Sequence, residues 1–282
     1  MKPPPFTYHA PASVSEALSL LSSLTDAKIL AGGQSLVPAM NFRLARPGHI
    51  IDINGLLDLS YVREESGWLA VGALARHVAF ESASVRDPLG ALLRTIAHLI
   101  GHLPIRVRGT FAGSIAHADP AAEWCLLAVT LGAELVCQSA STRRVVSADD
   151  FFETVFTTTL EPSELLVEVR IPILGSETRV GFQEFSRRAG DFGIVMALTA
   201  LEVKGDRIRK ARIGLGGVGG TPVRAKQAEQ VLLGESLSED VFAEAAQAAA
   251  SEIEPWEDIH GSVEYRKDLI RALTRRSLAQ PL

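Results

Sequence analysis

Apolar residues recur at helical spacing near the start of the chain. Ser13-Val14-Ser15-Glu16 has the pattern of a capping box, in which serine and glutamate satisfy each other's free amides. Apolar residues three and four positions apart follow it and predict a helix over about 14–24. Next come an expected strand, a glycine turn, a short helix and a second strand, at 27–31, 32–35, 36–44 and 49–53.

Alternating and helical runs are mixed between residues 57 and 172. Two alternating runs flank Glu65-Ser66-Gly67 and predict a hairpin over 59–74. Asp87-Pro88 is typical of an N-cap followed by the first residue of a helix. A polar, glycine-containing stretch over 106–119 predicts a loop. The other expected helices and strands lie at 76–85, 88–101, 120–131, 133–138, 143–146 and 164–172.

The pattern changes after Pro172–Ser176, where we expect a domain boundary. Lys204-Gly205-Asp206 predicts a tight hairpin turn between two long alternating runs. Thr221-Pro222 indicates the start of a helix after a run of glycines. The strands are expected at 178–187, 193–204 and 207–215, and two further helices at 237–252 and 262–278. The chain is therefore predicted to be α+β, with a small antiparallel meander on helices at its end.

Composition narrows the classes of protein that remain. The 282 residues correspond to about two domains, and 47% hydrophobic with 22% charged residues is typical of a globular chain. The 28 Lys and Arg against 33 Asp and Glu give a net charge of −5, which argues against nucleic-acid binding. Cys125 and Cys137 are the only cysteines. Two cysteines exclude a disulfide framework and a four-thiolate iron–sulfur cluster held by this chain alone.

The N-terminal sequence predicts the cellular location. Met1-Lys2-Pro3-Pro4-Pro5 is not followed by the apolar segment of a secretory signal, and no apolar run reaches the roughly 18 residues of a membrane span. We therefore expect a cytoplasmic protein with no membrane span.

The first candidate site is Ala31-Gly32-Gly33-Gln34-Ser35-Leu36. A glycine pair directly after a strand lets the main chain adopt positive φ and approach a ligand closely. The amides that follow, at a helix start, would form an anion site. A plain strand-to-helix turn explains the same residues about equally well. The motif is neither a Walker A loop nor a dinucleotide GxGxxG fingerprint.

The second candidate covers 108–123. It combines hydroxyls at Thr110 and Ser114 with small residues and with Glu123 near a helix N-terminus. Amides, hydroxyls and a carboxylate are the groups that a diphosphate joined to a polyol chain requires. Asp119 alternatively serves only as a helix cap.

The third candidate covers 184–193. Two arginines and an aspartate there could orient a ring system, although an exposed ion-pair cluster is the more ordinary interpretation.

Together these segments resemble one family, the medium, FAD-binding subunits of molybdenum hydroxylases. This group includes carbon monoxide dehydrogenase, nicotine dehydrogenase and the flavin domain of xanthine dehydrogenase. The resemblance extends over essentially the whole chain. The matching motifs are AGGQSL at 31–36, TFAGSIAHADPAAE at 110–123, FSRRAGDFG at 185–193 and GLGGVGGTPVRA at 214–225.

The resemblance implies a vanillyl-alcohol-oxidase (PCMH)-type FAD-binding domain over 1–175, in two subdomains of about 1–56 and 57–175. A carbon monoxide dehydrogenase flavoprotein-like C-terminal domain over 176–282 would close over the flavin. FAD would be bound non-covalently, with no catalytic or metal-binding residue in this chain. The implied FAD-binding residues are Ala31, Gly32, Gly33, Gln34, Ser35, Leu36, Thr110, Ala112, Gly113, Ser114, Glu123, Leu166, Arg188 and Asp191.

The resemblance also implies partners. Molybdopterin would lie in a large partner subunit and [2Fe-2S] clusters in a small one, and the whole complex would be a dimer of heterotrimers. Electrons would pass from the clusters through FAD to an external acceptor. Two alternatives stay open: a stand-alone FAD oxidase of the same fold, and a non-catalytic assembly subunit. The chain departs from the family at Ala112, where glycine is usual, and at Gln183, where some relatives have a lysine that faces the flavin.

Overall fold

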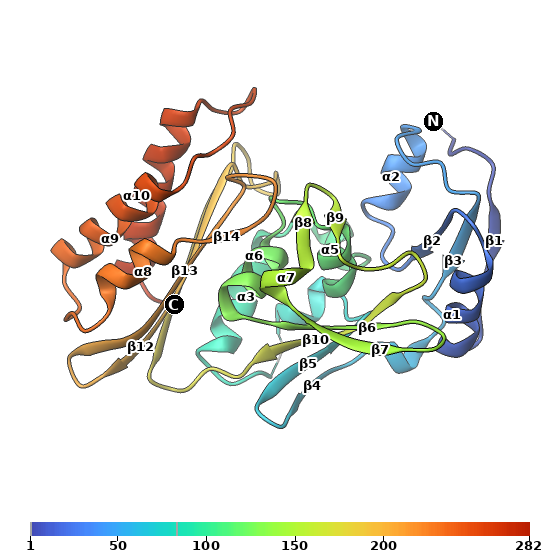
Figure 1. The fold of residues 1–282 in the computed structure, drawn as a ribbon, viewed down its shortest axis with the longest axis horizontal. Helices are drawn as coiled ribbons and strands as arrows, with labels where there is room; N and C mark the ends of the chain where they lie inside the picture. Colours follow the sequence, from blue (N-terminus) through green and yellow to red (C-terminus); the bar gives the residue numbers. More distant parts are fainter. Residues whose placement is uncertain (1, 83) are drawn as a thin grey trace.

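The computed structural model describes residues 2–82 and 84–282. In Figure 1 the chain runs from an N-terminal unit at the right, through a central sheet, to a C-terminal sheet covered by helices at the left. The mixed helix and sheet architecture confirms the predicted α+β class.

The N-terminal unit is built on a parallel sheet. Its strands pair in the order β1 (Thr7–His9), β3 (His49–Asp52) and β2 (Ala27–Leu30). Helix α1 (Val14–Ser23) begins at the predicted capping box. The Ser13 hydroxyl accepts from the Glu16 amide at 3.1 Å, and the Glu16 carboxylate accepts from the Ala12 amide. Helix α2 (Leu36–Asn41) is shorter than expected and follows the glycine turn.

The central unit contains an antiparallel five-stranded sheet. Its strand order is β4 (Val62–Glu65), β5 (Trp68–Gly72), β10 (Leu165–Pro172), β6 (Glu134–Gln138) and β7 (Arg143–Ser147). The hairpin β4–β5 turns at Ser66 and Gly67, both with positive φ, as the sequence predicted. The shorter elements of this unit are η1 (Leu57–Leu59), α7 (Ala148–Phe151), β8 (Phe152–Thr154) and β9 (Thr157–Thr158).

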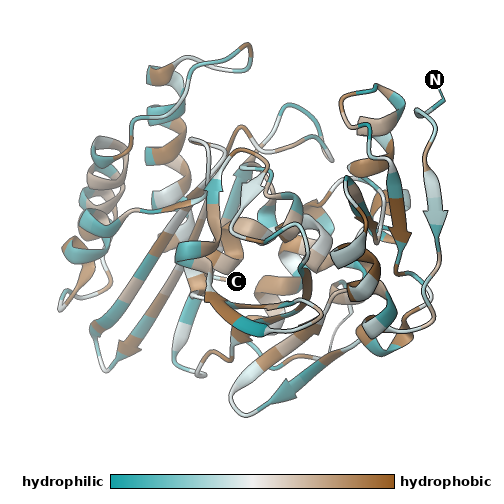
Figure 2. Ribbon diagram, turned by 45° about the vertical axis from the view of Figure 1, so that its right-hand side comes forward, coloured by the Kyte–Doolittle hydropathy of each residue, from teal (hydrophilic) through white to brown (hydrophobic). Residues whose placement is uncertain are grey.

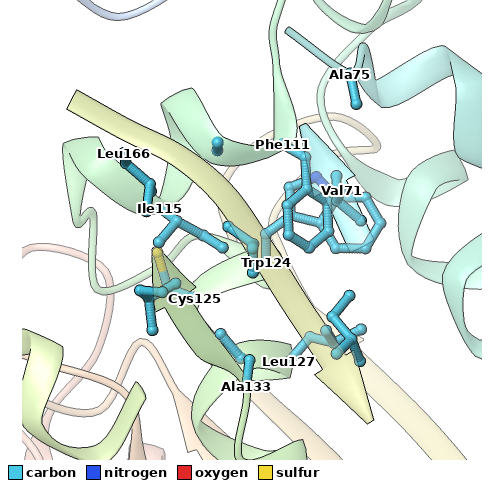
Figure 3. Packing of buried hydrophobic residues seen from close by; sticks show 14 of the residues in the cluster. Val71, Ala75, Phe111, Ile115, Trp124, Cys125, Leu127, Ala133 and Leu166 are labelled. Atoms are coloured by element: carbon cyan, nitrogen blue, oxygen red, sulfur yellow. The ribbon is translucent and has the colours of Figure 1, made fainter. Parts of the chain in front are cut away.

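The central unit also contains the helices α3 (Leu89–Leu99), α4 (Leu103–Arg106), α5 (Phe111–His117) and α6 (Glu123–Leu131). Phe111 and Trp124, from the first turns of α5 and α6, pack with ring centroids 4.6 Å apart, and Phe80 contacts both rings. All three side chains are fully buried. Figure 3 shows Phe111 and Trp124 in the core with Cys125, Ile115 and Leu166. This packing fixes the starts of α5 and α6 relative to each other.

The C-terminal sheet has strand order β11 (Thr178–Phe185), β12 (Val195–Lys204), β13 (Arg207–Gly216) and β14 (Val223–Arg224). Helices α8 (Lys226–Leu232), α9 (Glu239–Glu252) and α10 (Val263–Ala279) cover one face (Figure 1). Helices α3 and α6 of the central unit pack on the other face. Figure 2 shows hydrophobic residues concentrated where the helices face the sheets.

Several expected elements differ in the structure. The helix predicted over 76–85 is reduced to the single 3-10 turn η2 (His77–Phe80), whose first amide, that of His77, donates to the Gly109 carbonyl at 3.1 Å. Position 83 lies outside the described residues. The expected loop over 106–119 instead contains α5. Thr221-Pro222 precedes β14, and the helix begins only at Lys226.

Two predicted caps also behave differently. Asp87 bonds to Arg94 at 2.8 Å and does not cap α3, which begins at Leu89. Helix α6 begins at Glu123, since the Asp119 carboxylate accepts from the Ala121 amide at 2.9 Å in a turn before the helix.

The packing of α6 against the C-terminal sheet depends on Gly214. A Cβ atom at this position would lie 1.8 Å from Thr130 Oγ1 and 2.9 Å from Leu126 Cδ1. The Thr130 hydroxyl cannot yield freely, because it donates to the Leu126 carbonyl at 2.7 Å. We expect Gly214→Ala to lower the free energy of unfolding by about 1–3 kcal/mol, measured by denaturant titration. Gly219→Ala is the matched control, since no atom of the described part of the chain, apart from its own neighbours, lies within 4 Å of its Cβ position. Equal effects of the two variants would contradict this contact.

Candidate functional site

The first glycine motif forms the turn between β2 and α2. Gly33 has φ +70°, a conformation that favours glycine, and its carbonyl accepts from the Val37 amide at 3.0 Å. The amides of residues 33–36 have no hydrogen-bond acceptor among the described residues. This turn therefore presents several free donors in succession, which is the arrangement that binds an anion.

The second motif is a capped helix start rather than an open loop. Thr110 is the N-cap of α5, and its hydroxyl accepts from the Gly113 amide at 3.1 Å. The amides of Thr110 and Ala112 donate to no described residue. Neither Ala112 nor Gly113 has positive φ. Alanine at 112 therefore causes no backbone strain, although glycine is usual there in the family.

The structure brings these two motifs into direct contact. A Cβ atom on Gly32 would lie 2.6 Å from both the Arg108 carbonyl oxygen and the Gly109 Cα. A Cβ atom on Gly113 would lie 4.0 Å from the Ala31 side chain. The free amides of both motifs thus belong to one junction between the N-terminal and central units.

A pair of acids, Glu123 buried and Glu184 half-buried, lies where the central unit meets the C-terminal sheet. Glu123, the first residue of α6, is 5% exposed. Burial, the charge of Glu184 and the more distant Asp119 raise the pKa of Glu123 to about 8, although its own amide opposes them. Burial raises the pKa of Glu184, on β11, to about 7, and its Oε2 has no hydrogen-bond partner among the described residues. Glu184 was not among the predicted site residues, although it begins the third candidate segment.

His77 and Trp124 form a buried hydrogen-bonded pair beneath the junction, and the sequence did not predict it. The Trp124 indole donates to His77 Nδ1 at 2.9 Å, and His77 Nε2 lies 2.6 Å from the position of a Cβ on Gly109. Burial, with the charges of Arg76 and Arg106, lowers the pKa of His77 to about 4. The neutral ring therefore accepts from Trp124 and holds the main chain just before Thr110.

The remaining predicted residues lie around this junction. Leu166 is buried on β10, and Figure 3 shows it beside Ile115 of α5. Arg188 and Asp191 are exposed and form no ion pair with a described residue, which disfavours the ion-pair interpretation of their segment. Their loop contacts the central unit, because a Cβ on Gly190 would lie 2.4 Å from His102 Cε1. Gln183 lies on β11, opposite Ala197.

These residues fit the cofactor that the sequence suggested. Free amides at both glycine motifs suit a diphosphate, and the absence of a Cβ at Gly32 permits the close approach of the two motifs. The Ser114 hydroxyl, which has no partner among the described residues, and the unpartnered Glu184 oxygen suit a polyol chain. A flavin-binding protein is the class that this fold and this junction define.

Comparison with known proteins agrees with that class. The FAD binding domain in molybdopterin dehydrogenase matches residues 4–174, and the CO dehydrogenase flavoprotein C-terminal domain matches residues 181–280. The 6-hydroxypseudooxynicotine dehydrogenase complex subunit alpha of Paenarthrobacter nicotinovorans is 39% identical, over 100% of this chain and 96% of the relative. The carbon monoxide dehydrogenase medium chain of Hydrogenophaga pseudoflava is 36% identical, over 99% and 97%.

Solved structures give the same result. Quinoline 2-oxidoreductase from Pseudomonas putida 86 superposes with a TM-score of 0.93 at 39% identity, covering 99% of this chain and 98% of that one. Carbon monoxide dehydrogenase from Hydrogenophaga pseudoflava gives 0.94 at 37% identity, with the same coverage. The chain belongs to the FAD-binding medium subunits of the molybdenum hydroxylases, which are oxidoreductases. None of the helices in the described ranges combines the length and the hydrophobicity that a membrane crossing requires.

Proposed function

We propose that this chain carries FAD as the electron-transfer subunit of a molybdenum hydroxylase complex. The observation that carries this proposal is the contact between Gly32 and the main chain at Arg108 and Gly109, which brings two sets of free amides together. FAD, when bound, supplies a group that accepts and releases electrons. The protein binds it, orients it and limits its contact with water.

The proposed roles follow from the chemistry of each group. The amides that follow Gly32 and those at Thr110 and Ala112 hold the diphosphate. The Ser114 hydroxyl and the Glu184 carboxyl face the ribityl hydroxyls, and Glu123 is the buried acid near the FAD. Leu166 supplies an apolar contact. Arg188 and Asp191 approach from the C-terminal sheet, at the exposed edge of the flavin. No side chain acts as an acid, base or nucleophile on the organic substrate.

The proposed partners are a large molybdopterin-binding subunit, which oxidises the substrate, and a small [2Fe-2S] subunit, in a dimer of heterotrimers. Electrons then travel from the clusters to the FAD of this chain and on to an external acceptor. The relatives are named as medium or alpha subunits, which supports an assembly of this kind. The division at residues 175 and 176 is part of the proposal, supported by the change of sheet between β10 and β11. The cytoplasmic location stays a prediction.

Purification of the tagged chain from its own cells tests this function. We expect two partner proteins to copurify, with molybdenum and iron in fixed ratio to FAD, and we expect substrate to bleach the flavin absorbance of the complex. A chain that purifies alone with FAD and oxidises an organic substrate itself would favour the stand-alone oxidase. A partner complex whose flavin stays oxidised when substrate is added would exclude the electron-transfer role.

A further inference from the structure

A polar cluster lies directly behind the two glycine motifs. It contains Tyr8 on β1, Asp52 at the end of β3, Asn54 after β3, and Arg76 before η2. None of these four side chains belongs to the predicted FAD site. Asn54 and Arg76, which we call the brace, connect this cluster to the main chain of both motifs.

Asn54 fixes the start of the first motif. Its Nδ2 donates to the Ala31 carbonyl at 2.8 Å and to Asp52 Oδ1 at 2.6 Å. Asp52 is held in turn by the Tyr8 hydroxyl, which donates to Oδ2 at 2.7 Å. Although burial raises the pKa of Asp52, hydrogen bonds from Asn54 and Tyr8 and the charge of Arg76 lower it overall. The carboxylate therefore stays ionised and anchors the Asn54 amide.

Arg76 extends this connection to the second motif. One guanidinium nitrogen donates to Asn54 Oδ1 at 2.6 Å, and another donates to the Arg108 carbonyl. That carbonyl oxygen is the atom against which Gly32 packs. The brace thus joins Ala31 to Arg108 through two side chains and sets the separation between the two motifs.

The charges around the brace suit a dianionic ligand. Burial and the charge of Arg108 lower the pKa of Arg76, although the charge of Asp52 opposes them, so the Arg76 and Arg108 guanidinium groups repel each other. Arg108 is exposed beside the free amides of the second motif. A diphosphate at this junction would relieve the repulsion between the two cations.

We propose that Asn54 and Arg76 are positioning residues for FAD, which set the spacing of the two glycine motifs so that both bind one diphosphate. This inference rests on the proposed function, because it requires FAD at the junction. It assigns the brace to the diphosphate half of the ligand and gives it no part in holding the flavin ring.

Titration of the full-length apo chain with FAD, riboflavin and ADP shows whether the brace acts on the diphosphate or on the flavin ring. The variants are Asn54→Ala, Arg76→Ala and the double variant. Arg86→Ala is the matched control, because the Arg86 side chain is 83% exposed and, among the described residues, pairs only with Glu64, at 3.5 Å. Flavin fluorescence reports binding of FAD and riboflavin, and calorimetry reports binding of ADP. Thermal unfolding shows whether each variant is folded.

Each single variant is expected to weaken FAD and ADP about 10- to 100-fold, as for loss of buried hydrogen bonds to a charged group. Riboflavin, which has no diphosphate, should change less than about 3-fold. The double variant should be about as weak as either single variant, because the two side chains act as one unit. Three results would each overturn the proposal. These are an equal loss of FAD and riboflavin affinity, an unchanged FAD affinity, and a loss in the double variant equal to the product of the two single losses.

The variant Arg76→Lys tests the positioning role of Arg76 if the alanine variants do not fold. It keeps the charge but cannot reach Asn54 and Arg108 with two separate nitrogens. We expect it to weaken FAD about 5- to 20-fold with riboflavin unchanged, and equal binding by this variant and the wild type would overturn the proposal. Failure of the wild-type chain to bind FAD would instead refute the proposed function.

Discussion

Replacing Gly32 with alanine is expected to abolish the retention of FAD by the purified chain. The new Cβ would lie 2.6 Å from the Arg108 carbonyl oxygen and from the Gly109 Cα, and both are main-chain atoms that cannot rotate away. The two motifs must therefore move apart, and the amides of the first motif no longer face those at Thr110 and Ala112. We expect FAD affinity to fall at least about 100-fold, corresponding to about 3 kcal/mol.

The measurement is the flavin absorbance of the chain after incubation with FAD and removal of free ligand. Gly55→Ala is the matched control in the same unit, because among the described residues only its own chain neighbours lie within 4 Å of its Cβ position and its φ is not positive. It should retain FAD like the wild type. The Gly32 variant should also lose stability by about 1–3 kcal/mol while remaining folded. Full flavin content in a folded Gly32→Ala chain would remove the first motif from the site.

The second large effect is a loss of stability of the apo chain as the pH rises. The pKa values of Glu123 and Glu184 are raised to about 8 and about 7, from an ordinary value of 4.5. Between pH 4.5 and about pH 8 the two carboxyl groups keep protons in the folded chain that they release in the unfolded chain. The free energy of unfolding therefore falls with rising pH and levels off above about pH 8. The difference of about 3.5 units at Glu123 alone corresponds to about 5 kcal/mol as an upper limit.

Glutamine substitutions isolate this effect from other titrating groups. His77 acts in the opposite direction, because its pKa is lowered and the stability it contributes is lost as the pH falls through about 6 to 4. Glu123→Gln and Glu184→Gln should each be more stable than wild type at pH 8.5 and similar to it at pH 5, by thermal unfolding of the apo chain. Glu153→Gln, at an exposed position, is the control. Parallel curves of stability against pH for wild type and both variants would contradict the raised pKa values of this acid pair.

Local patterns predicted much of the fold from the sequence. The capping box at Ser13 and the apolar spacing after it correctly predicted α1, and the helix expected over 262–278 is α10. The alternating runs around Ser66 and Gly205 predicted two hairpins, because turn residues and strand alternation act over short distances. Helix α5 was missed, since Gly113 and Ser114 have low helix propensity. Its stability instead comes from the Thr110 cap and the burial of Phe111.

The site was predicted less completely, for a physical reason. The glycine motifs and the acid at Glu123 are visible in the local sequence, and the family resemblance added Leu166. The brace joins two side chains that are 22 positions apart, Asn54 and Arg76. Glu184 on β11 lies 61 positions after Glu123 on α6, whose pKa it raises. Such contacts exist only after the units have packed. Single-sequence patterns carry no signal for them.

The titration of the full-length apo chain with FAD tests the central claim most directly, namely that this junction is a flavin site. We predict saturation at one FAD per chain, with a shifted flavin absorbance that survives removal of free ligand, and loss of both in Gly32→Ala but not in Gly55→Ala. A folded wild-type chain that stays colourless after incubation with FAD would contradict the account.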